Sequence, residues 1–131
     1  MQDLTVLQAK RYGIFSCHDR TTLLEAARRM ANEDISALVV TDTEGYLAGI
    51  ITRTDLVRAH HGHPDWAAQT VEEYMSRPVV TVTPQHKLSH VAELLIEGQI
   101  HRVVVQEENG KQRPVGVVSS ADLVYHMAKE D

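Results

Sequence analysis

The chain is poor in cysteine and in long apolar runs. Its 131 residues contain a single cysteine, Cys17, which excludes an internal disulfide and fits a reducing compartment. No apolar run approaches the roughly 18 residues that a membrane span needs. The first five residues have neither the basic nor the apolar region of a signal peptide. We therefore expect a cytoplasmic protein that does not bind a membrane.

An excess of positive charge is also missing. The net charge is −5 with histidine neutral, which disfavours binding to a nucleic-acid backbone, so no nucleic-acid partner is expected. Hydrophobic residues make up 43% of the chain and charged residues 24%, a balance that predicts a globular protein rather than a disordered one.

The most informative stretch is a strand that turns directly into a helix, and it occurs twice. Residues 49–55 read Gly-Ile-Ile-Thr-Arg-Thr-Asp, and residues 116–122 read Gly-Val-Val-Ser-Ser-Ala-Asp. Other positions repeat at an offset of 65 residues, and two extra residues after Gly110 raise the offset to 67. The duplication covers nearly the whole chain, so the fold should consist of two copies of one unit.

Each copy predicts the order strand-helix-strand-strand-helix, preceded by a short helical turn. Asn109-Gly110 is a strong hairpin signal, matched by Glu44-Gly45 in the first copy. Asn32 and Gly98 should take the left-handed conformation near the helix ends. The expected elements are turns at 5–10 and 70–75, strands at 14–17, 36–40, 47–51, 79–82, 101–106 and 115–118, and helices at 22–31, 87–97 and from Thr52 and Ser119 onward.

These elements predict an α/β fold of two pseudo-symmetric repeats packed through their sheets, because one such unit leaves a sheet face uncovered. The first repeat is expected at residues 1–62 and the second at 63–131. The connector 60–69 is polar and contains Pro64, and we interpret it as a linker within one module.

The start of the last helix in each repeat has two interpretations. Thr52 with Asp55, and Ser119 with Asp122, match a capping box, in which hydroxyl and carboxylate pair with backbone amides of the first helical turn. A helix start can also bind a phosphate, and a carboxylate one turn later suits the diol of a ribose. The second interpretation predicts a nucleotide site.

Cationic side chains favour the nucleotide interpretation. His101 and Arg102 open a strand of the second copy, and a guanidinium matches phosphate oxygens. Arg102 could equally point into water at the end of its strand. Arg53 could approach a phosphate or remain a solvated side chain of the first helical turn.

The sequence resembles a tandem pair of CBS domains, an arrangement called a Bateman module. The resemblance covers essentially all of the chain. The residues that carry it are the two strand-to-helix stretches at 49–56 and 116–123, and the segments 75–82, 35–40 and 100–105.

The resemblance implies two clefts for adenosine-containing ligands, each composed of both repeats. The aspartates would bind ribose, Thr52 and Ser119 phosphate, and the apolar strand residues adenine. One cleft would comprise Thr52, Asp55, Val79, Val80, His101 and Arg102, and the other Ser119, Asp122, Ile14, Phe15, Ser36 and Ala37.

The expected function is that of a non-catalytic regulatory module. It would bind AMP, ADP, ATP or S-adenosylmethionine as an effector, sense adenine nucleotide levels, and signal by changing shape. The output would lie in a separate protein, or in a larger protein of which this chain is a regulatory fragment. The resemblance also implies a homodimer, and no cofactor is required. The alternative is a structural dimeric interaction module with vestigial clefts. An enzyme is not expected, because no nucleophile–base pair, acid–base carboxylate pair or metal cage has a recognisable spacing.

Three further features leave alternatives open. His60, His61 and His63 lie close to Asp65 and could hold a metal, but their spacing matches no closed zinc motif, which favours a polar linker. Cys17 is expected to be a small buried hydrophobic residue rather than a nucleophile. Trp66 could anchor the fold, contact a dimer partner or flank an adenine.

The two clefts should differ in affinity. Ser36 and Ala37 stand where the second copy has His101 and Arg102, so the Ser119/Asp122 cleft lacks that cation. We expect the Thr52/Asp55 cleft to bind a phosphorylated ligand more tightly. In titration calorimetry, Asp55→Ala should weaken AMP binding more than Asp122→Ala. A larger loss from the Asp122 substitution would contradict this expectation.

Overall fold

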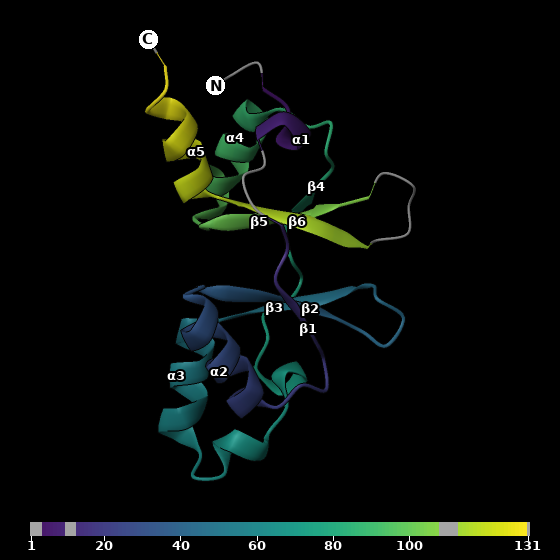
Figure 1. Ribbon diagram of the computed structural model, residues 1–131, viewed down its shortest axis with the longest axis vertical. Helices are drawn as coiled ribbons and strands as arrows, with labels where there is room; N and C mark the ends of the chain where they lie inside the picture. The colour runs from purple at the N-terminus through teal and green to yellow at the C-terminus, as the bar shows by residue number, and fades with distance from the viewer. Residues whose placement is uncertain (1–3, 10–12, 108–112, 131) are drawn as a thin grey trace. The chain divides into compact units, whose positions relative to one another are not determined.

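The computed structural model describes residues 4–9, 13–107 and 113–130, which form two compact units (Figure 1). One unit comprises Phe15–Val79, and the other comprises residues 1–14 together with residues 80–131. Each contains a three-stranded sheet with helices packed on it.

In the unit of residues 15–79, β2 is the central strand of the sheet. The sheet order is β1-β2-β3, with β1 parallel and β3 antiparallel to β2. The elements in chain order are β1 (Ser16–His18), α2 (Leu23–Glu33), β2 (Ala37–Thr41), β3 (Leu47–Thr52), α3 (Arg53–Gly62) and two 3₁₀ turns, η1 (Trp66–Ala68) and η2 (Val71–Glu73).

The second unit repeats this topology. Its sheet order is β4-β5-β6, again with a parallel and then an antiparallel pair. The elements are α1 (Val6–Ala9), β4 (Thr81–Val82), α4 (Leu88–Gly98), β5 (Arg102–Gln106), β6 (Pro114–Ser119) and α5 (Ser120–Met127). The predicted α/β class and the duplicated element order are confirmed.

The middle strand of each sheet supplies the centre of the core. The three inner residues of β2, Leu38 to Val40, and those of β5, Val103 to Val105, are all buried. A continuous apolar run of this kind is typical of a strand that is covered on both faces. Helices α2 and α4 contribute apolar side chains at helical spacing, among them Leu23 and Leu88, which are fully buried.

Each core is completed by a short segment that precedes or follows the strands and long helices of its unit. Val6 of α1 is fully buried in the core of the unit containing residues 80–131, and its amide donates to the His86 carbonyl at 2.8 Å. Val71 of η2 is fully buried in the core of the other unit, and its amide donates to the Thr21 carbonyl at 2.8 Å. The unit containing residues 80–131 is therefore assembled from two separate stretches of the chain, whereas the unit of residues 15–79 is contiguous. The repeats 1–62 and 63–131 remain a prediction about the duplication.

The helix ends differ from the sequence prediction. The left-handed residues are Asp34 and Gln99, with φ of 51° and 53°, so the assignment to Asn32 and Gly98 is wrong. Helices α2 and α4 continue to Glu33 and Gly98, past the expected ends. The left-handed residue directly follows the last residue of each helix. Because α2 and α4 end later than expected, the left-handed positions also lie later in the chain.

The turn at Gly45 is confirmed by a φ of 89°. The hairpin signal Asn109-Gly110 lies outside the described residues. The connector 60–69 is more ordered than expected, because α3 runs to Gly62 and Trp66 in η1 packs against the core of its unit. Trp66 thus anchors the fold.

The segment that follows η2 runs beside β3. Ile50 and Ser76 exchange backbone hydrogen bonds of 3.1 and 2.8 Å. A Cβ placed on Gly49 would lie 2.7 Å from the Met75 Sδ and 2.9 Å from the Ser76 carbonyl oxygen. Glycine is therefore required in β3 by this close approach.

We expect Gly49→Ala to destabilise the protein by about 1–3 kcal/mol, because the added methyl group forces the neighbouring backbone away from β3. Gly62→Ala is the matched control, since a Cβ there meets nothing within 4 Å, and its effect should stay within about 0.5 kcal/mol. Urea denaturation measures both free energies of unfolding. Equal stability of the two variants would contradict the close-approach argument.

Candidate functional site

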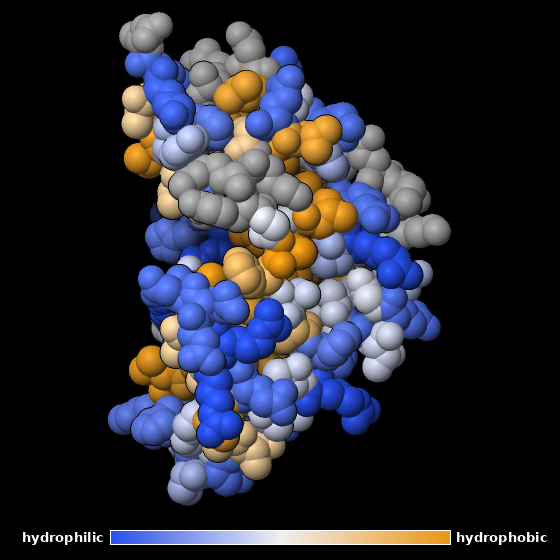
Figure 2. Space-filling model, viewed as in Figure 1, coloured by the Kyte–Doolittle hydropathy of each residue, from blue (hydrophilic) through white to orange (hydrophobic). Residues whose placement is uncertain are grey.

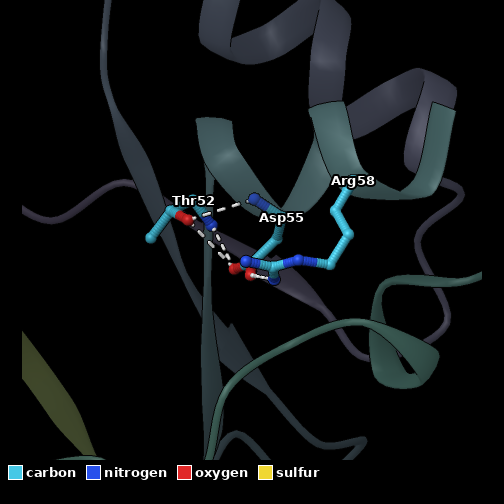
Figure 3. Close-up of polar contacts among 3 residues, drawn as sticks. All are labelled: Thr52, Asp55 and Arg58. Atoms are coloured by element: carbon cyan, nitrogen blue, oxygen red, sulfur yellow. Dashed lines mark hydrogen bonds and ion pairs between the residues drawn. The ribbon is translucent and has the colours of Figure 1, made fainter. Parts of the chain in front are cut away.

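The start of α3 is closed by a complete capping box (Figure 3). The Asp55 amide donates to the Thr52 Oγ1 at 3.3 Å. In return, the Asp55 Oδ2 accepts hydrogen bonds from the Thr52 amide at 2.9 Å and from the Thr52 hydroxyl at 3.0 Å. The capping interpretation of this motif is confirmed, and it fixes the carboxylate in place.

Asp55 is buried although it carries a charge. A buried carboxylate is tolerated only when donors surround it. Besides Thr52, the Arg58 Nη1 lies 3.3 Å from the Asp55 Oδ1. Arg58 follows Asp55 by three residues on α3, so the two side chains share one face of the helix.

The start of α5 has the same construction. The Ser119 amide donates to the Asp122 Oδ2 at 2.8 Å, and the Ser119 hydroxyl donates to the same oxygen at 3.2 Å. A complete capping box is again present, and Asp122 is buried. Both repeats thus place a hydroxyl and a carboxylate together at a helix start.

Each helix start lies beside the residue that precedes the middle strand of its own unit. The Arg53 amide donates to the Ser36 carbonyl at 3.1 Å, and the Ser120 amide donates to the His101 carbonyl at 2.9 Å. Across the sheets, Ala37 is the register partner of Thr52, and Arg102 is that of Ser119. Ser36 and Ala37 thus lie beside Thr52, and His101 and Arg102 lie beside Ser119.

The predicted clefts combine residues of both units, and those combinations remain predictions. Within its own unit, the Arg102 side chain is half-buried, and this burial lowers the pKa of its guanidinium from the usual value. An arginine side chain remains protonated at neutral pH even so. His101 is exposed. The Arg53 guanidinium pairs with the Asp34 carboxylate at 3.1 Å.

The predicted adenine-contacting residues lie just before the first strands. Phe15 and Val80 are large apolar residues, yet they are 37% and 40% exposed, whereas Ile14 and Val79 are partly buried. The carbonyl of Phe15 accepts from the Val39 amide, and that of Val80 accepts from the Val104 amide, both at 3.0 Å. The backbone is therefore anchored while apolar side-chain surface stays available for stacking on a planar ligand.

Sequence reasoning missed Arg58. The signal was present, because an acidic and a basic residue three positions apart on a helix are neighbours. Only the structure shows that the cation pairs with the buried carboxylate of the helix start.

The histidines near the end of α3 pack against aromatic rings. The His60 ring lies 5.2 Å from the Trp66 ring, and the His63 ring lies 5.9 Å from the Tyr74 ring, measured between centroids. Among the residues that the structure describes, no group of three or more histidine, cysteine, aspartate or glutamate side chains could hold a metal ion.

Cys17 lies in β1 and is buried, as expected. Burial raises the pKa of its thiol to about 11, although the nearby Arg29 opposes the shift. Since the thiolate is the nucleophilic form, this thiol is unreactive at neutral pH.

The two α/β units, each with a capped strand-to-helix turn, define a tandem repeat of one small α/β domain. Residues 9–62 and 71–129 both match the family model of the CBS domain. The chain belongs to the CBS domain family, and the resemblance found in the sequence is confirmed.

Solved structures agree with this assignment. The CBS domain pair of protein MJ0100, in complex with 5′-methylthioadenosine and S-adenosyl-L-methionine, is 27% identical with a TM-score of 0.85, over 98% of both chains. The CBS-domain containing protein ATU1752 from Agrobacterium tumefaciens is 26% identical with a TM-score of 0.81, over 95% of this chain and 99% of that one.

Among the curated relatives, the L-aspartate semialdehyde sulfurtransferase of Methanocaldococcus jannaschii is 32% identical over 108 residues, which is 82% of this chain. The chain spans only 20% of that protein's length. The similarity therefore concerns one part of a much longer protein.

No helix in the described part of the chain is long and apolar enough to cross a membrane.

We expect Thr52→Ala to destabilise the protein by about 1–2 kcal/mol, because it removes the hydroxyl that caps α3 and donates to the buried Asp55. Thr52→Ser keeps the hydroxyl and should lose less than about 0.5 kcal/mol. Chemical denaturation of the two variants measures the difference, and equal stabilities would show that the hydroxyl contributes nothing.

Proposed function

We propose that this chain is a non-catalytic regulatory module that binds an adenosine-containing ligand and signals to a partner protein by a conformational change. One observation carries the proposal. The chain is similar over 98% of its length to a CBS domain pair solved with 5′-methylthioadenosine and S-adenosyl-L-methionine. Both ligands contain an adenosine.

The geometry of the helix starts supports the same ligand class. Thr52 with Asp55, and Ser119 with Asp122, each combine a hydroxyl with a carboxylate that is held rigidly by its cap. A rigid carboxylate can accept hydrogen bonds from a ribose diol without losing further conformational freedom. The exposed apolar side chains of Phe15 and Val80 offer surface to an adenine.

Regulation requires that the ligand favour one state of the module over another. In this proposal AMP, ADP, ATP or S-adenosylmethionine is the effector, adenine nucleotide levels are the signal, and the output lies in a separate protein or in another part of a longer chain. The proposed compartment is the cytoplasm.

A homodimer is part of the proposal. In the unit containing residues 80–131, α4 and α5 carry apolar side chains exposed to solvent: Ile96 at 76%, Val124 at 59% and Met127 at 52%. Figure 2 shows that hydrophobic side chains do reach the surface on the face it displays. Large exposed apolar side chains favour contact with another protein surface when they gather into a patch.

Titration calorimetry with S-adenosylmethionine, 5′-methylthioadenosine, AMP and ATP tests the proposal. We expect at least one of them to bind, and the double variant Asp55→Asn/Asp122→Asn to lose at least about tenfold in affinity, because an amide is a weaker acceptor than a carboxylate. Asparagine retains an oxygen for each cap.

The matched control is Glu33→Gln, which removes one exposed carboxylate at the end of α2 and should leave binding unchanged. Mass spectrometry of small molecules released from the purified protein should identify the bound nucleoside. If none of the four compounds binds, the proposal fails and the interpretation as an interaction module with vestigial clefts is favoured.

A further inference from the structure

The two oxygens of the Asp55 carboxylate have different partners (Figure 3). Oδ2 accepts from both the amide and the hydroxyl of Thr52, so its two lone pairs are used. Oδ1 faces the Arg58 guanidinium at 3.3 Å. A ligand that binds this carboxylate must therefore do so mainly through Oδ1.

The Arg58 contact is one that a ligand can replace. The Asp55 side chain is 7% exposed, whereas the Arg58 side chain is 69% exposed. An ion pair with so exposed a partner contributes little to stability and is screened by salt. Both lone pairs of Oδ2 are thus used by the cap, whereas a ligand could replace Arg58 as the partner of Oδ1.

A vicinal diol has two hydroxyl groups that can donate. While Arg58 occupies one lone pair of Oδ1, a single acceptor position remains for both hydroxyls. The guanidinium must therefore leave before the diol can donate both of its hydrogen bonds. We propose that Arg58 competes with the ligand's ribose for Asp55, and so makes this site discriminate against uncharged adenosyl ligands.

A phosphorylated ligand changes this competition. Its phosphate offers a displaced guanidinium another anion to pair with, whereas uncharged adenosine offers none. The cost of displacing Arg58 is therefore offset for AMP but not for adenosine. This inference rests on the proposed function, since it assigns to Arg58 the ligand preference of that same site.

The other repeat has a neutral side chain at this position. Tyr125 stands 67 residues after Arg58, three residues beyond Asp122 on α5. The Tyr125 ring lies against the His126 ring and beneath the Lys129 ammonium. A tyrosine carries no positive charge, so it cannot form the kind of ion pair that Arg58 forms with Asp55.

Calorimetry with adenosine and AMP on the wild type and Arg58→Met tests the inference. We expect Arg58→Met to bind adenosine about two- to fivefold more tightly, the range that loss of an exposed ion pair allows, and AMP no more tightly than the wild type. Arg28→Met removes an exposed arginine of α2 in the same unit and should change neither affinity. A site at Asp122 contributes equally in all three proteins, so their differences report on Asp55.

Salt provides a second measurement. Adenosine is uncharged, so its binding to the wild type should strengthen as sodium chloride screens the Arg58–Asp55 pair. The adenosine affinity of Arg58→Met should not change with salt.

Arg58→Tyr introduces the residue that the other repeat has at this position, and it should behave like Arg58→Met. Agreement between the two variants would exclude an effect specific to the methionine side chain. If the wild type binds adenosine and both variants bind it equally or more weakly, the inference is wrong and the proposed function stands. If neither adenosine nor AMP binds any of the proteins, the proposed function fails and the inference fails with it.

Discussion

The buried carboxylate at the start of a helix is the constraint on which the rest of this structure depends. Asp55 and Asp122 are charged and almost fully buried, and such a group is tolerated only with hydrogen-bond donors around it. In both units the amide and the hydroxyl of the residue three positions earlier in the chain donate to the carboxylate. This requirement fixes where each sheet ends and its last helix begins. It also means that the groups stabilising the fold are those proposed to bind the ligand.

The second constraint is that each core needs a short segment from outside the strands and long helices of its unit. Val6 fills the core of the unit formed by residues 80–131, and Val71 fills that of the other unit. Each of these valines is fully buried and lies in a segment hydrogen-bonded to the loop before the first long helix. Without these segments each core would lack a fully buried side chain, which is costly for units of this size.

The backbone is more similar between the two units than the side chains around the caps are. Strand order, register and both capping boxes recur in the two units. The side chains around the caps do not recur, since Ala37 corresponds to Arg102, and Arg58 corresponds to Tyr125. Packing keeps the backbone alike because every core position is shared with many neighbours. Positions at the strand and helix ends are less constrained, so the two copies can differ there in ligand preference.

Local patterns were sufficient to predict the element order, the α/β class and both helix starts. Capping boxes and apolar periodicity involve residues three or four apart, so the sequence displays them directly. The helix ends at Asp34 and Gln99 were misplaced by one or two residues, because termination depends on the next contact as well as on local preference. Only the folded chain showed that Val6 and Val71 complete the two cores, that Trp66 anchors its unit and that Arg58 pairs with a buried oxygen. These contacts depend on which surfaces pack together and which atoms are removed from water on folding. The spacing of residues along the sequence predicts neither the packing nor the desolvation.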